Sequence, residues 1–450
     1  MLIFNKEIMR KIKYIYIVLV STLFITACDN DLDQLPPKGL EATALNDYTP
    51  VLNAAYHYHT GVATPQLVMG DFRADNMLMQ EPPFTAFDLY NSELAGLDLV
   101  EQFFRPYYSN LYKSILSANI VIENSSSSTQ VAEAKFLRAL SYFKLVVVFG
   151  DVTVNLSASP STSDLSILVR QPAANVYDNV IIPDLQGAIQ GLNNSDLSSG
   201  RATQIAARAF LGKVYLYRGN FTNAATELSA VINNATGAGV TLESNFSDVV
   251  TDGNSEVIFA TIRSTSVADL YSATEFPGWF DGSDTKSLLP LDSRLTDAFD
   301  ASSASGGATD LRKVLTVDTA NSKGVKYTGG LEQDFIEMRL TDVILMYAEA
   351  LNENGSAATT VLPLLDDIRT RAGLNSLTGT ATTQAAVRTA IQTERRLELA
   401  FEGHRWFDLV RTGTVNTEMG QTIDPNYYIF PIPNSEILAS DGVITQNAGY

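Results

Sequence analysis

Apolar residues recur at helical spacing along most of this 450-residue chain, and the clearest examples are pairs of short helices. One pair is predicted over 206–215 and 224–232, with the tight turn 218–220 between them. A second pair, 340–352 and 360–371, has the same layout. Helix pairs of this kind bury their apolar faces only by stacking on neighbouring pairs, so the pattern favours an all-α body of successive irregular copies.

The first pair resembles the tetratricopeptide repeat, in which small residues let the two helices approach closely. Leu211, Gly212, Tyr215 and Ala224 match core positions of that repeat, whereas Arg208 stands where a tryptophan is usual. We therefore predict an all-α fold: an irregular tetratricopeptide-like superhelix with long loop insertions.

Two long helices and four long connections complete the predicted frame. Residues 131–149 are apolar on nearly all sides, which is typical of a central helix, and Gly150 ends the run. A single helix is predicted over 383–412, closed by Gly413. Long structureless connections are uncommon unless they are functional, so we expect the ligand-facing residues there. These connections are rich in Gly, Ser and Thr and cover 60–97, 150–172, 233–290 and 301–330.

The single cysteine, Cys28, directly follows an apolar leader that ends at Ala27. The chain has no second cysteine with which Cys28 could form a disulfide. The position of Cys28 directly after the leader is therefore the feature that indicates its role. The residues that end at Cys28 resemble the lipobox of bacterial lipoproteins, in which cleavage exposes a cysteine that carries lipid. We predict a lipoprotein signal peptide over 1–27, a lipidated tether over 28–40 and one helical domain over 41–450. An ordinary signal peptide followed by a stray cysteine is the alternative.

Charge and motif content argue against several classes of protein. The chain has a net charge of −19 at pH 7, and loss of the basic leader makes the mature protein more acidic still. Such a chain is repelled by phosphate backbones, so no nucleic-acid partner is expected. His57 and His59 point apart on a helix, which makes a zinc site improbable. No paired cysteines, phosphate-binding glycine loop or nucleophile motif predicts a metal, a cofactor or a catalytic site.

The segment 394–411 has a dense pattern of charges. Glu394, Glu398 and Glu402 recur at i, i+4, an arrangement of like charges that destabilises a helix unless outside cations compensate it. Two of these carboxylates could be mistaken for the acid/base pair of a glycosidase. We favour a structural charge network that clamps this helix to its neighbours. The residues predicted to form it are Glu394, Arg395, Glu398, Arg405, Trp406, Asp408 and Arg411.

This charged segment resembles the C-terminal signature of the SusD/RagB family, lipoproteins that capture glycans at the outer surface of Bacteroidetes. Other pieces of the chain match the family in the same order, so the resemblance covers nearly the whole sequence. They are the lipobox at Cys28, 133–139 continuing to 149–152, 292–295, 338–352, 431–433 and 446–450. Thr153 and Ala448 depart from the family pattern, which has proline at both places.

The resemblance implies a non-catalytic protein that is lipid-anchored in the outer membrane at the cell surface. Such a protein caps a TonB-dependent, SusC-like transporter and hands it an oligosaccharide. A surface glycoside hydrolase and a protein-binding scaffold or adhesin are the alternatives. Degradation of a glycan would indicate the first, and protein capture without glycan binding would indicate the second.

The sugar sites of the family lie in variable loops, so the aromatic residues of this chain have to indicate the site. Sugar rings stack their C–H faces on aromatic planes, and their hydroxyls need polar side chains nearby. Trp279 lies between Gly278 and Gly282, which let a bulky ring project from a turn. The alternative is that these aromatic rings pin long loops to the core. The first predicted set is Tyr271, Phe276, Trp279, Phe280, Asp281 and Asp284, and the second is Arg73, Asp75, Asn76, Phe84, Phe87 and Tyr90.

Overall fold

The computed structural model describes residues 45–161, 163–195, 197, 199–263, 291–327 and 330–450, in which Asp47–Tyr450 is one compact unit. Cys28, the predicted leader and the predicted tether lie outside the described residues. In the described part of the chain, no helix is both long enough and apolar enough to cross a membrane.

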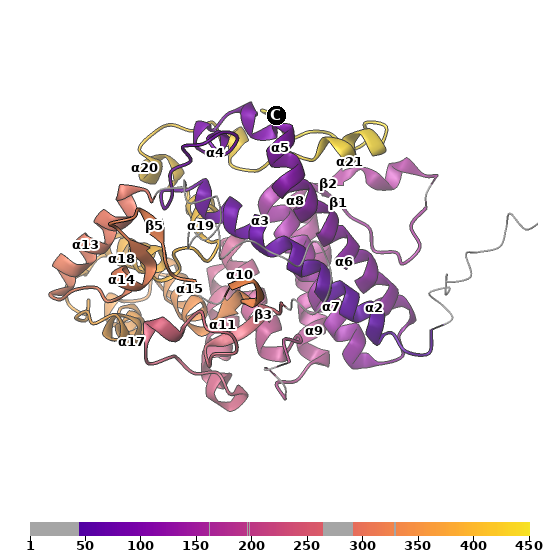
Figure 1. Cartoon of the computed structure of the whole chain (residues 1–450). Helices are drawn as coiled ribbons and strands as arrows, with labels where there is room; N and C mark the ends of the chain where they lie inside the picture. Colours follow the sequence, from indigo (N-terminus) through magenta and orange to yellow (C-terminus); the bar gives the residue numbers. More distant parts are fainter. Residues whose placement is uncertain (1–44, 162, 196, 198, 264–290, 328–329) are drawn as a thin grey trace, which may run out of the picture. The chain divides into compact units, whose positions relative to one another are not determined.

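The core of the unit is a row of eight helices in which each helix packs against the next one in sequence order (Figure 1). This stacking agrees with the predicted all-α frame, because each amphipathic helix buries its apolar face on two neighbours. The row consists of α2 (Thr49–His57), α6 (Arg105–Asn124), α7 (Ser128–Phe149), α9 (Ile182–Gly191), α10 (Gln204–Tyr217), α11 (Phe221–Ala235), α15 (Leu340–Glu353) and α18 (Gln384–Glu398).

Other elements surround this row. The remaining helices are α3 (Ala63–Leu67), α4 (Ala86–Leu89), α5 (Leu97–Leu99), α8 (Ala173–Val176), α13 (Ser293–Gly306), α14 (Arg312–Thr316), α16 (Ala358–Val361), α17 (Pro363–Arg371), α19 (Arg405–Thr412), α20 (Val415–Met419) and α21 (Asn434–Ala439). Antiparallel strand pairs are β1 (Val152–Thr153) with β2 (Arg170–Gln171), β3 (Val257–Thr261) with β6 (Phe335–Arg339), and β4 (Val317–Asp318) with β5 (Lys323–Gly324).

The α7 helix is as central as its sequence predicts. It starts three residues earlier than predicted, at Ser128, because the Ser127 hydroxyl accepts a hydrogen bond from the Gln130 N–H and caps the first turn. Gly150 ends it with a φ of +72°.

The predicted helix pair around residue 212 forms α10 and α11. A β-carbon on Gly212 would lie 2.6 Å from the Leu228 side chain on α11. No side chain larger than glycine fits that gap, so the small residue sets how closely the two helices pack.

The prediction of a single helix over 383–412 is wrong. The chain leaves the helix after Glu398 and begins α19 at Arg405, with left-handed φ values of 65° at Phe401 and 76° at Gly403. The buried Asp71 carboxylate stabilises this turn because it accepts hydrogen bonds from the N–H groups of Phe401 and Gly403.

A second contact at this turn excludes a continuous helix. A β-carbon on Gly70 would lie 2.3 Å from the Gly403 carbonyl carbon, so two glycines let the backbones touch. Gly70 belongs to the π-helical turn η4 (Val68–Phe72), which packs against α19.

The connection predicted over 60–97 also differs, because η4, α3, α4 and α5 give it helical structure and bury much of it. Likewise, the region 301–330 contains the end of α13, all of α14 and the β4–β5 pair.

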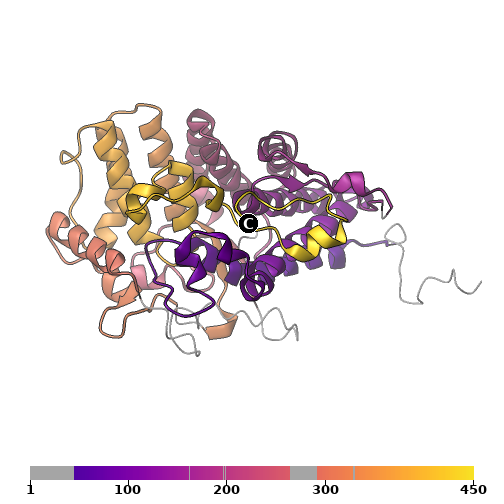
Figure 2. The same cartoon turned by 90° about the horizontal axis from the view of Figure 1, so that it is seen from above.

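Figure 2 shows the C-terminal segment, in yellow, running over the helices of both ends of the row. Backbone and side-chain hydrogen bonds hold it there: the Phe430 N–H donates to the Val148 carbonyl, and the Asn447 amide donates to the Phe149 carbonyl. The last residues therefore close over the end of α7.

Candidate functional site

The carboxylates of α18 lie in a buried charge network, which we call the α18 network. Its side chains are at most 5% exposed. Five carboxylates face five cations, so the charges balance, as burial requires. The members are Glu256, Asp310, Glu394, Glu398 and Glu402 with Arg312, Lys326, Arg339, Arg369 and Arg371.

Arg339 lies at the centre of this network. Its guanidinium is 3.0 Å from Glu256, 3.0 Å from Glu398 and 2.9 Å from Glu402. The i, i+4 spacing of the glutamates predicted outside cations without identifying them. Arg339 lies in the 338–352 motif, which entered the sequence analysis only as part of the family resemblance.

These carboxylates cannot act as the acid/base pair of a glycosidase. Burial alone would raise the pKa of Glu398, but Arg371, Arg339 and Arg312 outweigh burial and lower the pKa to about 2. Burial would likewise raise the pKa of Glu402, but Arg339 and Lys326 lower it to about 2. A group that stays ionised, buried and fully paired has no proton to give to a leaving group.

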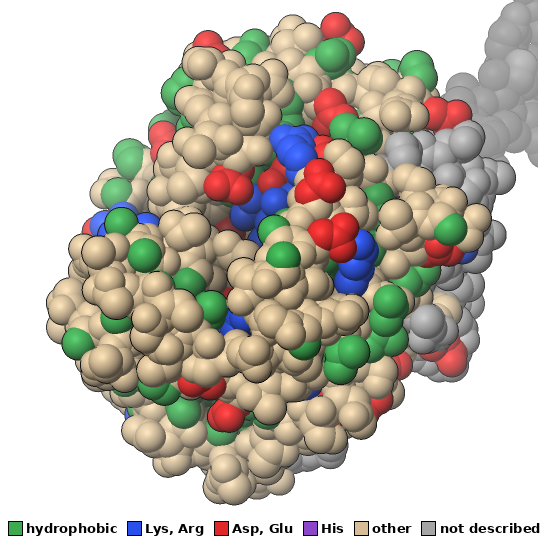
Figure 3. Space-filling model, turned by 90° about the vertical axis from the view of Figure 1, so that its left-hand side faces the viewer, with side chains coloured by type: hydrophobic (Ala, Val, Ile, Leu, Met, Phe, Trp, Pro, Cys, Tyr) green, Lys and Arg blue, Asp and Glu red, His purple; other side chains and the backbone are tan. Residues whose placement is uncertain are grey.

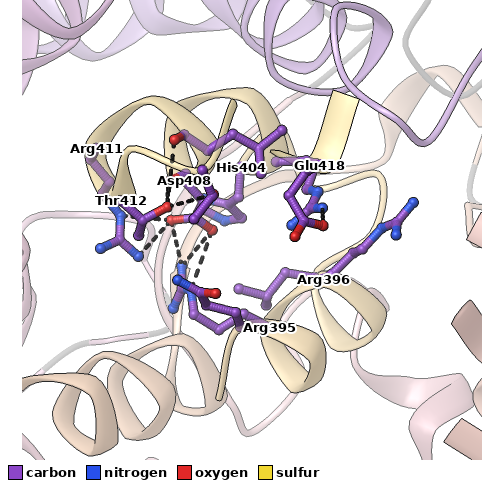
Figure 4. Close-up of a pocket in the computed structure, with 12 residues that line it drawn as sticks. Arg395, Arg396, His404, Asp408, Arg411, Thr412 and Glu418 are labelled. Carbon is purple, nitrogen blue, oxygen red and sulfur yellow. Dashed lines mark hydrogen bonds and ion pairs between the residues drawn. The ribbon is translucent and has the colours of Figure 1, made fainter. Parts of the chain in front are cut away.

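A second network, the α19 network, joins Asp408 to its neighbours. Asp408 lies between Arg395 and Arg411 and accepts hydrogen bonds from both (Figure 4). Arg395 also binds Asp342 at 2.7 Å, and Arg411 binds Glu349 at 2.5 Å. These ion pairs join α18, α19 and α15.

The pocket drawn in Figure 4 has a volume of 410 Å³, part of it open to solvent, and its lining includes Arg395, Asp408 and Arg411 of the α19 network. Arg396 points away from Asp408 and binds the Asp75 carboxylate at 2.9 Å, and Arg405 binds the same carboxylate at 2.7 Å. On the face of the unit that includes α13 and α20, charged side chains of both signs gather in a hollow (Figure 3). The charges of the lining are already paired, so this pocket offers a ligand little unsatisfied charge.

Trp406 anchors α19 inside the protein, as predicted. Its ring is fully buried, stacks on Tyr90 with centroids 5.8 Å apart, and donates its N–H to the Tyr428 carbonyl at 3.1 Å. The Arg73 guanidinium lies 5.0 Å from both the Tyr90 and the Trp406 ring centroids. Such a stack of a cation on two aromatic rings stabilises the junction of α19 with the segment after η4.

Much of the second predicted sugar-binding set is therefore packed inside. Arg73, Asp75, Asn76, Phe87 and Tyr90 are all buried. The Asn76 amide donates to Asp71 and the ring of Phe87 meets Phe103 and Phe104, so these side chains have protein partners where a sugar was expected. Phe84 keeps part of its surface exposed.

Tyr271, Phe276, Trp279, Phe280, Asp281 and Asp284 lie outside the described residues. The described residues on either side of this segment, Arg263 and Leu291, both form hydrogen bonds with other parts of the structure. On one side the Arg263 N–H donates to Asp334 at 2.8 Å. On the other side Leu291 forms a β-bridge with Met77, which places that end beside the second predicted set.

Three open pockets lie elsewhere on the described surface. One, of 1080 Å³, follows the chain from Pro82 to Leu99. Another, of 990 Å³, lies between α6 and the loop after β1. The third, the Tyr56 pocket, encloses 680 Å³ and is lined by residues that include Asn53, Tyr56, His59, Thr60, Arg201 and Thr261. The described residues contain no group of three or more His, Cys, Asp or Glu side chains that could hold a metal ion.

Comparison with known proteins matches this fold to a family. A model described as "SusD family" matches residues 301–426, and one described as "Starch-binding associating with outer membrane" matches residues 40–216. The SusD-like protein P2 of Formosa agariphila is 28% identical, over 75% of this chain and 77% of that protein.

Solved structures agree over nearly the full length. A laminarin binding SusD-like protein is 27% identical, with a TM-score of 0.65, and the match covers 90% of this chain and 99% of that one. A SusD superfamily protein from Bacteroides vulgatus, at 21% identity and a TM-score of 0.75, covers 90% of this chain and 98% of that one and supports the fold. Since the two family models match a segment in each half of the chain, and the SusD-like relatives match most of its length, this protein belongs to the SusD/RagB family.

Proposed function

We propose that this protein is a cell-surface glycan-binding lipoprotein that captures oligosaccharides and delivers them to a TonB-dependent, SusC-like transporter in the outer membrane. The observation that carries the proposal is the full-length match to a laminarin binding SusD-like protein. The description of the N-terminal family model, starch binding and association with the outer membrane, supports the same role. Binding without catalysis agrees with the burial and ion pairing of the α18 carboxylates, which leave none of them free to act as an acid or a base.

In this proposal the glycan contacts the aromatic segment around Trp279. Phe84, from the second predicted set, adds to the same binding surface. The bridge between Met77 and Leu291 supports this grouping, because it joins the described end of the first segment to the second one. Aromatic platforms and nearby carboxylates such as Asp281 and Asp284 suit the C–H faces and hydroxyls of a sugar.

Trp279→Ala is expected to weaken binding of laminarin or starch oligosaccharides by about five- to a hundredfold, because one stacked ring contributes about 1 to 3 kcal/mol. Isothermal titration calorimetry measures the affinities, and thermal melting checks that the fold is intact. Tyr347→Ala, at a half-buried tyrosine on α15, is the control and should bind like the wild type. Equal affinities for Trp279→Ala and the wild type would move the site elsewhere.

Lipid anchoring and transport are tested together. If Cys28 carries lipid, the wild type should fractionate with outer membranes and co-purify with a TonB-dependent barrel after mild detergent extraction. Cys28→Ala should be released from membranes or keep its leader. A processed Cys28→Ala protein that stays on the membrane would refute lipidation, and repeated absence of the barrel from wild-type preparations would refute delivery to a transporter.

A further inference from the structure

The Tyr56 pocket lies on the helical frame between α2, α7 and β3. Leu137 on α7 and Phe259 on β3, both buried, form apolar parts of its lining, and Ile262 contributes a half-exposed side chain. The polar residues named above complete it. Apolar surface with a few polar groups around it is the usual composition of a small-molecule site.

One buried atom of this pocket's residues lacks a partner. His59 is 3% exposed, and its Nε2 lies 3.2 Å from the Ser141 hydroxyl. Its Nδ1 is buried and has no hydrogen-bond partner among the described residues. Buried polar atoms in proteins nearly always have a partner, so a water or a polar group of a ligand is expected at this nitrogen.

The hydrogen-bonding groups of the pocket call for a ligand that both donates and accepts. The Thr60 hydroxyl donates to the His57 carbonyl at 2.7 Å, and the Thr261 hydroxyl donates to Glu337 at 3.0 Å. Both threonine oxygens can therefore only accept from a ligand. The Asn53 amide, in contrast, uses its oxygen to accept from Arg201, so its NH₂ group remains to donate.

The charges of the pocket are balanced. The Arg201 guanidinium covers the Tyr56 ring at 4.7 Å and pairs with Glu133 at 2.8 Å. Burial, followed by the charge of Lys144, holds the pKa of His59 well below its usual value, so the imidazole is neutral. A charged ligand would meet no unpaired charge here, whereas an uncharged one avoids the large cost of burying a charge and has to replace only the hydration of its polar groups.

We propose that the Tyr56 pocket binds one neutral sugar unit of the glycan, as a contact additional to the aromatic loop. Hydroxyl groups both donate and accept, which is what His59, the two threonines and Asn53 require together. The C–H face of the ring packs on Ile262, the apolar lining residue with an exposed side chain. This inference rests on the proposed glycan-binding function and adds a subsite to it on the rigid helical frame.

Thr60→Val tests the subsite, since it removes the accepting hydroxyl and keeps the shape of the side chain. With laminaribiose and maltose as probes, binding of the better probe is expected to weaken by about five- to twentyfold. Thr153→Val is the matched control: Thr153 is equally buried and also donates to a backbone carbonyl at 2.7 Å, but it lies outside the pocket. The control should bind like the wild type.

Asn53→Ala gives a second readout at an exposed position, with an expected two- to fivefold loss, should the buried variant fold poorly. A crystal structure of the mature chain with the bound disaccharide should place a sugar hydroxyl about 3 Å from His59 Nδ1. Wild-type affinity in both variants, or a water alone at His59 Nδ1, overturns the inference and leaves the proposed function standing. A wild type that binds neither disaccharide also overturns it, and a glycan array then decides the proposed function separately.

Discussion

Replacing Glu398 with alanine should lower the free energy of unfolding by about 3 to 5 kcal/mol, because breaking a buried ion pair leaves uncompensated charge. The Glu398 carboxylate binds Arg312 at 3.2 Å, Arg339 at 3.0 Å and Arg371 at 2.6 Å. None of these guanidiniums is exposed enough to recover its hydration after the change. Urea unfolding followed by circular dichroism measures the loss.

Arg388→Ala on the same helix is the control. Arg388 pairs with Glu353 at 2.6 Å, but its side chain is 39% exposed. An exposed pair contributes about 1 kcal/mol or less, so this variant should unfold close to the wild type. Glycan affinity should survive in folded Glu398→Ala. A variant with full stability and no glycan binding would instead identify Glu398 as a ligand-binding carboxylate.

The second large effect is acid unfolding. Glu398 and Glu402 have pKa values of about 2 in the folded protein, well below their ordinary value of 4.5. Each carboxylate therefore stabilises the fold fully above pH 4.5, and this contribution is lost as the pH falls toward 2. The expected loss is about 3 kcal/mol for each group taken alone. Glu398 and Glu402 both bind Arg339. The stability lost when both are protonated should therefore differ from the sum of the two separate losses.

The contribution of Asp71 to stability changes with pH in the opposite direction. Burial raises its pKa to about 6, although Asn76, Gly403 and Phe401 donate hydrogen bonds to it. Its contribution is largest at low pH and is lost as the pH rises through 6, so it offsets part of the acid loss. Unfolding free energies should thus fall steeply below pH 4.5. Constant stability from neutral pH down to about 3 would contradict the assigned ionisation of the α18 network.

Local patterns predicted the helical frame well. The apolar run 131–149 and the small Gly212 are features of short stretches, and helix packing uses them directly. The i, i+4 glutamates likewise predicted a clamp, since like charges on one stripe require partners. The partners themselves, such as Arg312 and Lys326, come from distant elements, and spacing alone does not identify them.

The errors share one physical cause, which is long-range contact. The break after Glu398 depends on Asp71 and Gly70, and 394–411 contains no proline that would mark it. Tyr90 was predicted to face a sugar because it lies with other aromatic and polar residues in the predicted connection 60–97, but the ring stacks on Trp406 instead. The sequence alone does not show whether an aromatic side chain faces solvent or the core.

The meeting of Gly70 with Gly403 also dictates when this protein can finish folding. Asp71 and Asp75 enter the chain early, yet the Gly403 N–H and the Arg405 guanidinium that satisfy them are made near its end. Contacts between such distant residues slow folding, because a long loop must close before any of them forms. The packing around Asp71 and Asp75 can therefore be completed only when α19, from the C-terminal part of the chain, docks against η4 and the residues that follow it.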